Sequence, residues 1–123
     1  MAKLIELDSN VSLMQQVNEG SSDPVVLINA FTVDPADLDQ FLKAWTADAE
    51  IMKRQSGFIS TQLHRGIAGS CAFVNYAVWE SPDHFKRAFG NPEFQASLRN
   101  YPQSAAASPH LFRKLGVAGI CVA

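Results

Sequence analysis

The side chains best suited to chemistry in this sequence are an asparagine and a tryptophan four residues apart in an apolar segment, residues 71–79. Because side chains alternate across a strand, Asn75 and Trp79 would share one face with Phe73 and Ala77. A buried amide without a partner costs about 1–3 kcal/mol. The presence of Asn75 at the centre of an apolar strand therefore requires an explanation. Either its side chain bonds a neighbouring backbone group or a water, or Asn75 and Trp79 present an amide and a flat ring to a ligand.

A second asparagine interrupts another apolar segment. Residues 25–33 are rich in β-branched and apolar side chains, which is typical of a strand covered on both faces, and Asn29 lies at their middle. Amide and indole N–H groups, and an arginine such as Arg99, can donate hydrogen bonds to negative charge that develops on a substrate. Any chemistry is therefore expected in an apolar pocket that contains a few amides and aromatic rings.

Several familiar catalytic and binding motifs are absent from the sequence. It contains no glycine-rich phosphate loop, no Gly-x-Ser-x-Gly elbow and no His-Glu-x-x-His motif. The three histidines, His64, His84 and His110, lack the spacing of metal ligands, and the two cysteines form neither a disulfide framework nor a metal motif. We therefore expect no metal site.

The elements that must position these residues follow from the hydrophobic pattern. Residues 1–23 are ambiguous, with a short helix or strand near 11–17. Strands are expected at 25–33, 58–65, 71–80 and 110–117, with a loop at 103–109 and helices at about 35–55, 82–89 and 92–100. This β-α-β-β-α-β order, with the second helix broken in two, predicts an α+β fold of the ferredoxin-like split βαβ type.

The strands carry apolar side chains on both faces, although the helices of such a fold cover only one. Packing two sheets face to face in a homodimer is an economical way to cover the other face. On the first helix, apolar residues at helical spacing, including Trp45, predict a core-facing stripe. The charged residues of that helix, Asp48 among them, are expected to face solvent.

Length and composition bound the remaining possibilities. With 123 residues and 47% hydrophobic content, the chain is most simply one domain, residues 1–123. A net charge of −2 without long charged runs gives no indication of nucleic-acid binding. The apolar runs are too short for a membrane span, and the first residues lack the pattern of a signal peptide, so we expect a cytoplasmic protein with no membrane partner.

A resemblance adds to this interpretation. The segment from Phe73 to Ser81, followed by an aromatic residue four positions later and by Phe89 and Gly90, resembles the antibiotic biosynthesis monooxygenase superfamily. It is especially similar to the small cofactor-independent enzymes that form quinones in aromatic polyketide pathways. The resemblance covers about residues 25–117 and leaves 1–23 as an N-terminal extension. It implies a dimeric α+β barrel of two ferredoxin-like units that oxidises a small phenol or hydroquinone with molecular oxygen and no cofactor.

The resemblance also implies roles for individual residues. Asn75 and Trp79 match the strand asparagine and tryptophan of the quinone-forming enzymes, Asn29 matches a second strand asparagine, and Arg99 falls where some members have a pocket arginine. These four are the expected catalytic residues. The expected substrate-binding residues are Phe73, Phe85, Phe89 and Leu98. Phe85 stands where some members have a tyrosine, so a hydroxyl group is missing there.

Three other functions remain open from the sequence. The haem-degrading members of the superfamily share Asn29 and Trp79, but Leu98 occupies the position of their axial histidine, so ordinary haem ligation is not expected. A non-catalytic barrel that binds a small aromatic ligand would use the same two asparagines to orient it. A purely structural dimer would instead satisfy its amides internally and leave no continuous pocket beside Asn75.

Overall fold

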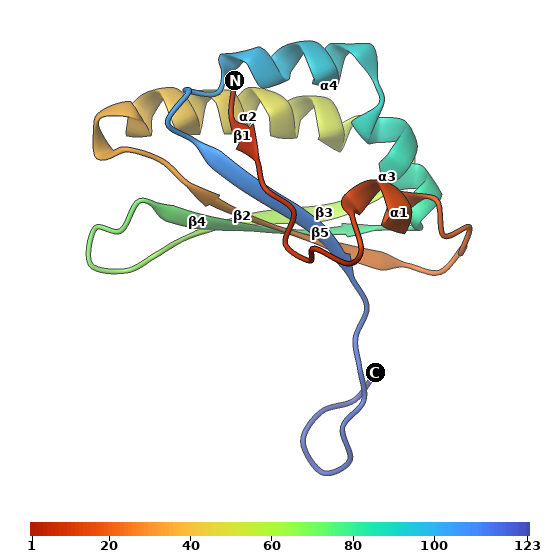
Figure 1. Ribbon diagram of the computed structural model, residues 1–123. Helices are drawn as coiled ribbons and strands as arrows, with labels where there is room; N and C mark the ends of the chain where they lie inside the picture. Colours follow the sequence, from red (N-terminus) through yellow and green to blue (C-terminus); the bar gives the residue numbers. More distant parts are fainter.

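Five strands form one mixed sheet in the computed structural model, which describes residues 1–123 (Figure 1). The strands are β1 (Lys3–Leu4), β2 (Val25–Thr32), β3 (Phe58–Arg65), β4 (Ala72–Trp79) and β5 (Ala106–Phe112), in the spatial order β1-β5-β2-β4-β3. Without β1, this is the antiparallel arrangement of a ferredoxin-like unit, with β2 between β5 and β4. The predicted α+β class is confirmed, and the expected strands at 58–65 and 71–80 pair with one another as β3 and β4.

The helices all begin where the sequence offers a cap or a proline. They are α1 (Leu13–Val17), α2 (Leu38–Lys53), α3 (Pro82–Phe89) and α4 (Pro92–Ser97), with single 3₁₀ turns η1 (Pro35–Asp37) and η2 (Leu98–Asn100). The Ser81 hydroxyl accepts a hydrogen bond from the His84 N–H at 3.2 Å, and Asn91 caps α4 in the same manner. Asp34 makes no side-chain cap bond, so Pro35 alone marks the start of η1. Figure 1 shows α2, α3 and α4 on one face of the sheet.

The N-terminal extension is part of the folded unit. Its ambiguous segment forms α1, whose Leu13 and Val17 are only 2% and 5% exposed. Before α1, strand β1 pairs in parallel with β5. The Ile5 N–H donates to the carbonyl of Ala107 in β5, and the Lys3 N–H donates to the carbonyl of Ala105, the residue before β5, each at 2.8 Å. The extension therefore adds a fifth strand to the edge of the sheet.

The last strand begins and ends earlier than expected. Residues 103–109 were predicted as a loop and 110–117 as the strand, whereas β5 runs from Ala106 to Phe112. Small residues and proline have low strand propensity, but pairing with β2 along its whole length overrides that preference. Pro109 is tolerated because β1 pairs only with Ala106 and Ala107, which leaves that edge of β5 open beside Pro109.

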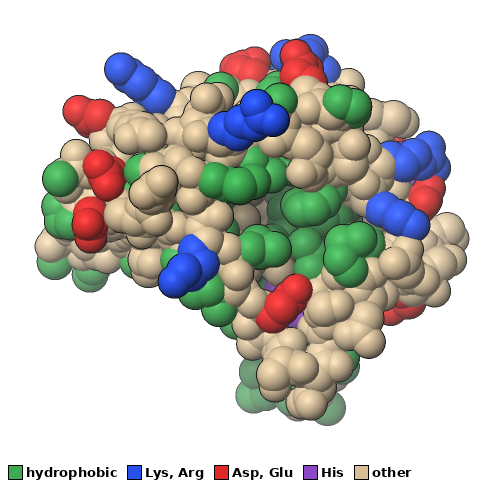
Figure 2. Space-filling view, turned by 45° about the horizontal axis from the view of Figure 1, so that its top comes forward, with side chains coloured by type: hydrophobic (Ala, Val, Ile, Leu, Met, Phe, Trp, Pro, Cys, Tyr) green, Lys and Arg blue, Asp and Glu red, His purple; other side chains and the backbone are tan.

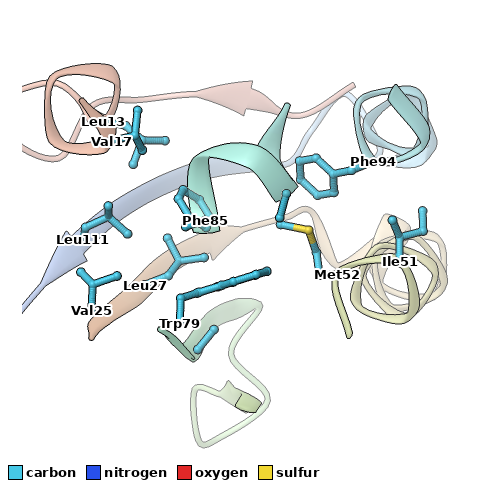
Figure 3. Close-up of a cluster of buried hydrophobic side chains, with 12 residues drawn as sticks. Leu13, Val17, Val25, Leu27, Ile51, Met52, Trp79, Phe85, Phe94 and Leu111 are labelled. Atoms are coloured by element: carbon cyan, nitrogen blue, oxygen red, sulfur yellow. The ribbon is translucent and has the colours of Figure 1, made fainter. Parts of the chain in front are cut away.

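Alternation along the central strands points the buried side chains to the helix-covered face, where they form two clusters. One cluster includes Leu27, Trp79 and Phe85 and packs against Met52 on α2. In Figure 3 the Trp79 indole extends from its strand toward Met52. The second cluster includes Phe31, Phe41, Phe73 and Tyr101. Both clusters lie between the sheet and the helices, and both contribute residues to the lining of the candidate site.

The opposite face of the sheet is not covered by a helix (Figure 1). Val74 and Tyr76 point to this face and are each 39% exposed, as alternation predicts. Beyond β5, residues 113–123 are exposed and extend away from the rest of the chain. None of the helices combines the length and the apolar character needed to cross a membrane.

Candidate active site

A cavity of about 340 Å³ lies between the sheet and the helices that cover it, a volume within the usual range of small-molecule sites, roughly 300–1,000 Å³. Its sides are mostly hydrophobic and come from strands β1 to β5, helices α2, α3 and α4, the turn η2 and neighbouring residues. Figure 2 shows a hollow in the surface with hydrophobic side chains gathered inside it. The few polar groups in this lining therefore act in a poorly hydrated space, where their electrostatic effect is enhanced.

Two asparagine side chains line the cavity from neighbouring strands. Asn29 and Asn75 are direct partners in the antiparallel pairing of β2 and β4. The Ser108 backbone N–H donates to Asn29 Oδ1 at 3.0 Å, and the Thr61 hydroxyl donates to Asn75 Oδ1 at 2.5 Å. Because a backbone N–H can only donate, the Ser108 bond fixes which way the Asn29 amide is turned. With both oxygens engaged, each amide keeps its N–H groups for a ligand.

Trp79 supplies a third donor. Its side chain is 1% exposed and lies edge-on to Phe58 and Phe85, with ring centroids 5.5 Å and 5.8 Å away. The indole Nε1 is buried without a hydrogen-bond partner, which is costly for a protein group. Trp79 lines the cavity, although Nε1 itself has almost no accessible surface, so an acceptor atom reaches this N–H only if neighbouring side chains shift.

Three of the four predicted apolar wall residues line the cavity: Phe85, Phe89 and Leu98. Phe85 and Phe89 are in contact, with ring centroids 5.6 Å apart. The fourth residue, Phe73, shares the predicted face of β4 but lies outside the cavity, because it packs against Phe41 at 4.8 Å in the second cluster. Its expected contact with substrate is therefore not supported.

Arg99, an expected catalytic residue, also lies outside the cavity. It belongs to the 3₁₀ turn η2, where it is exposed, while its neighbour Leu98 turns inward. One residue changes the direction of a helical side chain by about 100°, so an approximate match in a short turn does not place a guanidinium in the pocket. The structure thus brings Asn29, Asn75 and Trp79 together without Arg99.

The sequence pattern did not predict that an acidic side chain, Asp48, lines the cavity. Asp48 was expected to face solvent, but it lines the cavity, and the Tyr101 hydroxyl donates to its Oδ2 at 2.7 Å. Burial raises the pKa of Asp48 from 3.8 to about 6, although the Tyr101 hydrogen bond acts in the opposite direction. Burial likewise raises the pKa of Tyr101, so its hydroxyl stays protonated. The spacing held a signal, since Asp48 follows Trp45 and precedes Met52 at the three- and four-residue intervals of the stripe.

Trp45 is less buried than the sequence predicted. It was predicted as core, and it is half-buried and lines the cavity.

The N-terminal extension closes another part of the lining through Met1, Ala2 and Leu4. No pattern in residues 1–23 indicated this contact, because it depends on the pairing of β1 with β5.

Residues 24–100, which hold both asparagines and Trp79, match the family described as antibiotic biosynthesis monooxygenase. The chain belongs to the antibiotic biosynthesis monooxygenase family. Membership identifies it as a monooxygenase of the antibiotic biosynthesis type, as the resemblance implied.

Relatives of this monooxygenase family include enzymes of Streptomyces nogalater. Deoxynogalonate monooxygenase is 35% identical over 80 residues, which cover 64% of this chain and 67% of that protein. The structure of SnoaB, a cofactor-independent oxygenase, superposes with a TM-score of 0.70 and 29% identity over 79% of this chain and 98% of that one. A proposed monooxygenase from Shewanella loihica PV-4 gives a TM-score of 0.67 and 31% identity over 80% of this chain and all of that one.

The site fits poorly with the haem-degrading branch of the family. Leu98 lines the cavity at the position where an axial histidine would be needed, and none of the three histidines lines it. His110, the most buried, lies on β5 within hydrogen-bond distance of Gln16, 3.1 Å between their Nε2 atoms. No cluster of three His, Cys, Asp or Glu side chains has the arrangement of a metal site.

Proposed function

We propose that this chain oxidises an electron-rich phenol to a quinone with molecular oxygen, without flavin, metal or haem. The main support is the geometry of Asn29 and Asn75, which face one another across two strands with their oxygens occupied and their N–H groups free. Together with the unpaired indole N–H of Trp79, they form a set of donors in an apolar cavity. Such a set stabilises negative charge on a bound aromatic molecule.

The need for donors follows from the chemistry of oxygen. Molecular oxygen is a triplet and reacts slowly with closed-shell molecules, so the substrate must be bound as an anion that can give up one electron. In the proposed reaction the phenolate reduces oxygen to superoxide, and the two radicals combine at a ring carbon to form a peroxide. Loss of water then gives the quinone, so that phenol and O₂ yield quinone and H₂O. The substrate supplies all four electrons, and no external reductant is required.

The donors have a defined task in this sequence. Asn29, Asn75 and Trp79 would hold the phenolate oxygen and then the peroxide, on which the negative charge resides in turn. The aromatic walls, Phe85 and Phe89, would exclude water that could hydrolyse or protonate the intermediate. SnoaB, a structural relative, is described as a cofactor-independent oxygenase, which supports the same class of reaction here.

We also propose that the protein acts as a homodimer in the cytoplasm. The dimer would cover the sheet face that carries Val74 and Tyr76, which no helix covers. The cytoplasmic location is supported by the sequence pattern alone.

Oxygen consumption tests the proposed function. Purified protein, freed of metal by a chelator, is mixed with hydroxynaphthols such as 1-naphthol under ¹⁸O₂. We expect oxygen uptake above the protein-free rate, one labelled oxygen atom in the quinone, and loss of activity in Asn75→Ala. Binding of the same compounds without uptake would instead indicate a ligand-binding protein, and hydrogen peroxide as the stoichiometric product would indicate an oxidase.

A further inference from the structure

One carboxyl group shares the cavity with the three N–H donors, and the proposed reaction leaves it without a task. Asp48 lies on α2, and its Oδ2 accepts the hydrogen bond from Tyr101. Its other oxygen, Oδ1, has no hydrogen-bond partner within the protein. Tyr101 is 3% exposed and stacks on Phe31, with ring centroids 6.0 Å apart, so its hydroxyl holds Asp48 in a fixed orientation. Asp48 therefore lines the cavity with one carboxyl oxygen held by Tyr101 and the other unpaired.

A purely structural role explains this arrangement poorly. Burial among apolar residues raises the pKa of Asp48 to about 6, so the ionised form is destabilised by its surroundings. The lining contains one other titratable side chain, Tyr101. No arginine or lysine lines the cavity to pair with the carboxylate. A carboxyl group kept at such a cost in a ligand-sized cavity is typical of a functional group.

The polar groups of the lining are also complementary to one another. Asn29, Asn75 and Trp79 offer hydrogen-bond donors from the sheet, whereas Asp48 offers an acceptor from α2. We propose that Asp48 is the base that removes the hydroxyl proton of the bound phenol, with Tyr101 as its positioning residue. This inference rests on the proposed function and narrows the substrate to aromatic molecules whose reactive hydroxyl lies against Asp48.

The step is a proton transfer without redox change. The substrate O–H bond breaks, its electron pair stays on the phenol oxygen, and the proton forms a new O–H bond with Asp48 Oδ1. The phenolate then reacts with oxygen as described above. A base with a pKa near 6 is ionised at neutral pH and still accepts a proton readily, which suits general-base catalysis.

Ligand binding under nitrogen tests the inference without any turnover. The probes are 1-naphthol, whose hydroxyl ionises well above neutral pH as that of tyrosine does, and 1-methoxynaphthalene, which has no hydroxyl proton. Quenching of Trp45 and Trp79 fluorescence reports binding, because both rings line the cavity. The affinity for 1-naphthol should rise about tenfold as pH increases through about 6, since a phenol donates a stronger hydrogen bond to a carboxylate. The affinity for 1-methoxynaphthalene should not rise.

Three variants test whether Asp48 acts as a base or has only a structural role. Asp48→Asn keeps the shape but cannot accept the proton, so kcat/KM for 1-naphthol should fall about 10²- to 10⁴-fold near neutral pH. The loss should shrink above the pKa of the substrate, where the phenol is already ionised. Tyr101→Phe removes a hydrogen bond that lowers the pKa of Asp48, so it should move the acidic limb of the pH profile upward. Asp39→Asn, an exposed position of the same helix, should leave rate and profile unchanged.

The outcomes distinguish this inference from the proposed function. If oxidation proceeds but Asp48→Asn retains the wild-type rate and acidic limb, Asp48 is not the base although the function stands. The same binding of both naphthalenes at every pH, or binding of neither, overturns the inference as well. If no oxidation occurs but 1-naphthol binds with the expected pH dependence, the hydroxyl contact with Asp48 is supported while the oxygenase function fails.

Discussion

Asn29 and Asn75 face one another directly across β2 and β4, and both side chains line the same cavity. Direct partners in an antiparallel pair have Cβ atoms about 4.5–5.5 Å apart, so the two amides can reach a single ligand atom. Their oxygens accept hydrogen bonds from Ser108 and Thr61, which turns the N–H groups to other partners. In the proposed function the pair would act as one donor site supplied by two strands.

A double-mutant cycle tests whether the two amides act together. Asn29→Ala and Asn75→Ala should each lower kcat/KM for an accepted phenol by about 10²- to 10³-fold, because each removes one donor to developing charge. The double variant should lose less than the product of the two, since both amides bind the same atom. Asn10→Ala, at an exposed position that does not line the cavity, is the control. Strictly multiplicative effects would show that the amides contact separate parts of the substrate.

Trp79→Phe should separate activity from stability. The variant keeps an aromatic ring between Phe58 and Phe85 but loses the unpaired indole N–H. We expect a loss of about 10²-fold in kcat/KM, as for other removed donors. The change in unfolding free energy should be small, because the lost packing is offset by removing a buried unpaired donor that costs about 1–3 kcal/mol. Urea unfolding and oxygen uptake measure the two effects; equal loss of both would contradict the proposed role.

Asp48 should make the protein less stable as pH rises. Its pKa is raised by burial from 3.8 to about 6, so the folded state holds this proton more tightly than the unfolded state. Between about pH 4 and pH 6 the unfolding free energy should therefore fall, by at most about 3 kcal/mol at 1.36 kcal/mol per pKa unit and by less where solvent reaches the carboxylate.

The matching variant removes this pH dependence. Asp48→Asn should lose that part of the slope and should be more stable than wild type by about 1–3 kcal/mol at neutral pH. Urea titrations from about pH 4 to about pH 8 measure it, and Asp39→Asn is the control. An unchanged slope in Asp48→Asn would show that Asp48 is ionised as freely in the folded state as in the unfolded one.

Leu4 should influence which aromatic molecules the cavity accepts. It lies on β1, outside the family match of residues 24–100, and it lines the cavity while 57% of it remains exposed. Leu4→Trp should therefore weaken binding of tricyclic phenols more than that of single-ring phenols. Leu7→Trp, at a position 56% exposed that does not line the cavity, should bind both classes as the wild type does. A parallel loss for both ring sizes in Leu4→Trp would point to disturbed pairing of β1 instead.

Val74→Lys should dissociate the proposed homodimer. Val74 is 39% exposed on the sheet face that no helix covers, and a lysine there would place a charge in a sheet-to-sheet interface. Sedimentation of the wild type should give the mass of two chains and that of the variant the mass of one. Ile67→Lys, at an exposed turn position, should remain dimeric. A monomeric wild type would remove the basis of the dimer proposal.

The sequence predicted the parts that depend on local pattern. Alternation placed Asn75 and Trp79 on one face, and the helices expected at 82–89 and about 92–100 correspond to α3 and to α4 with η2. The pairing of Asn29 with Asn75 was not predictable, because it depends on the register between strands far apart in the chain. Asp48 was wrongly predicted to face solvent, because charged residues usually do so and because its partner Tyr101 lies 53 positions away. Arg99 was misplaced because a family match does not fix the direction of a side chain in a short turn.

The parallel pairing of β1 with β5 also has a practical consequence for work with this protein. Met1 and Ala2 lie in the lining of the cavity, whereas residues 113–123 extend away from it. An affinity tag joined before Met1 would begin beside the cavity, and it would compete with ligands or displace β1. A tag joined after Ala123 would begin far from the cavity, so assays of this enzyme are best made with C-terminally tagged or untagged protein.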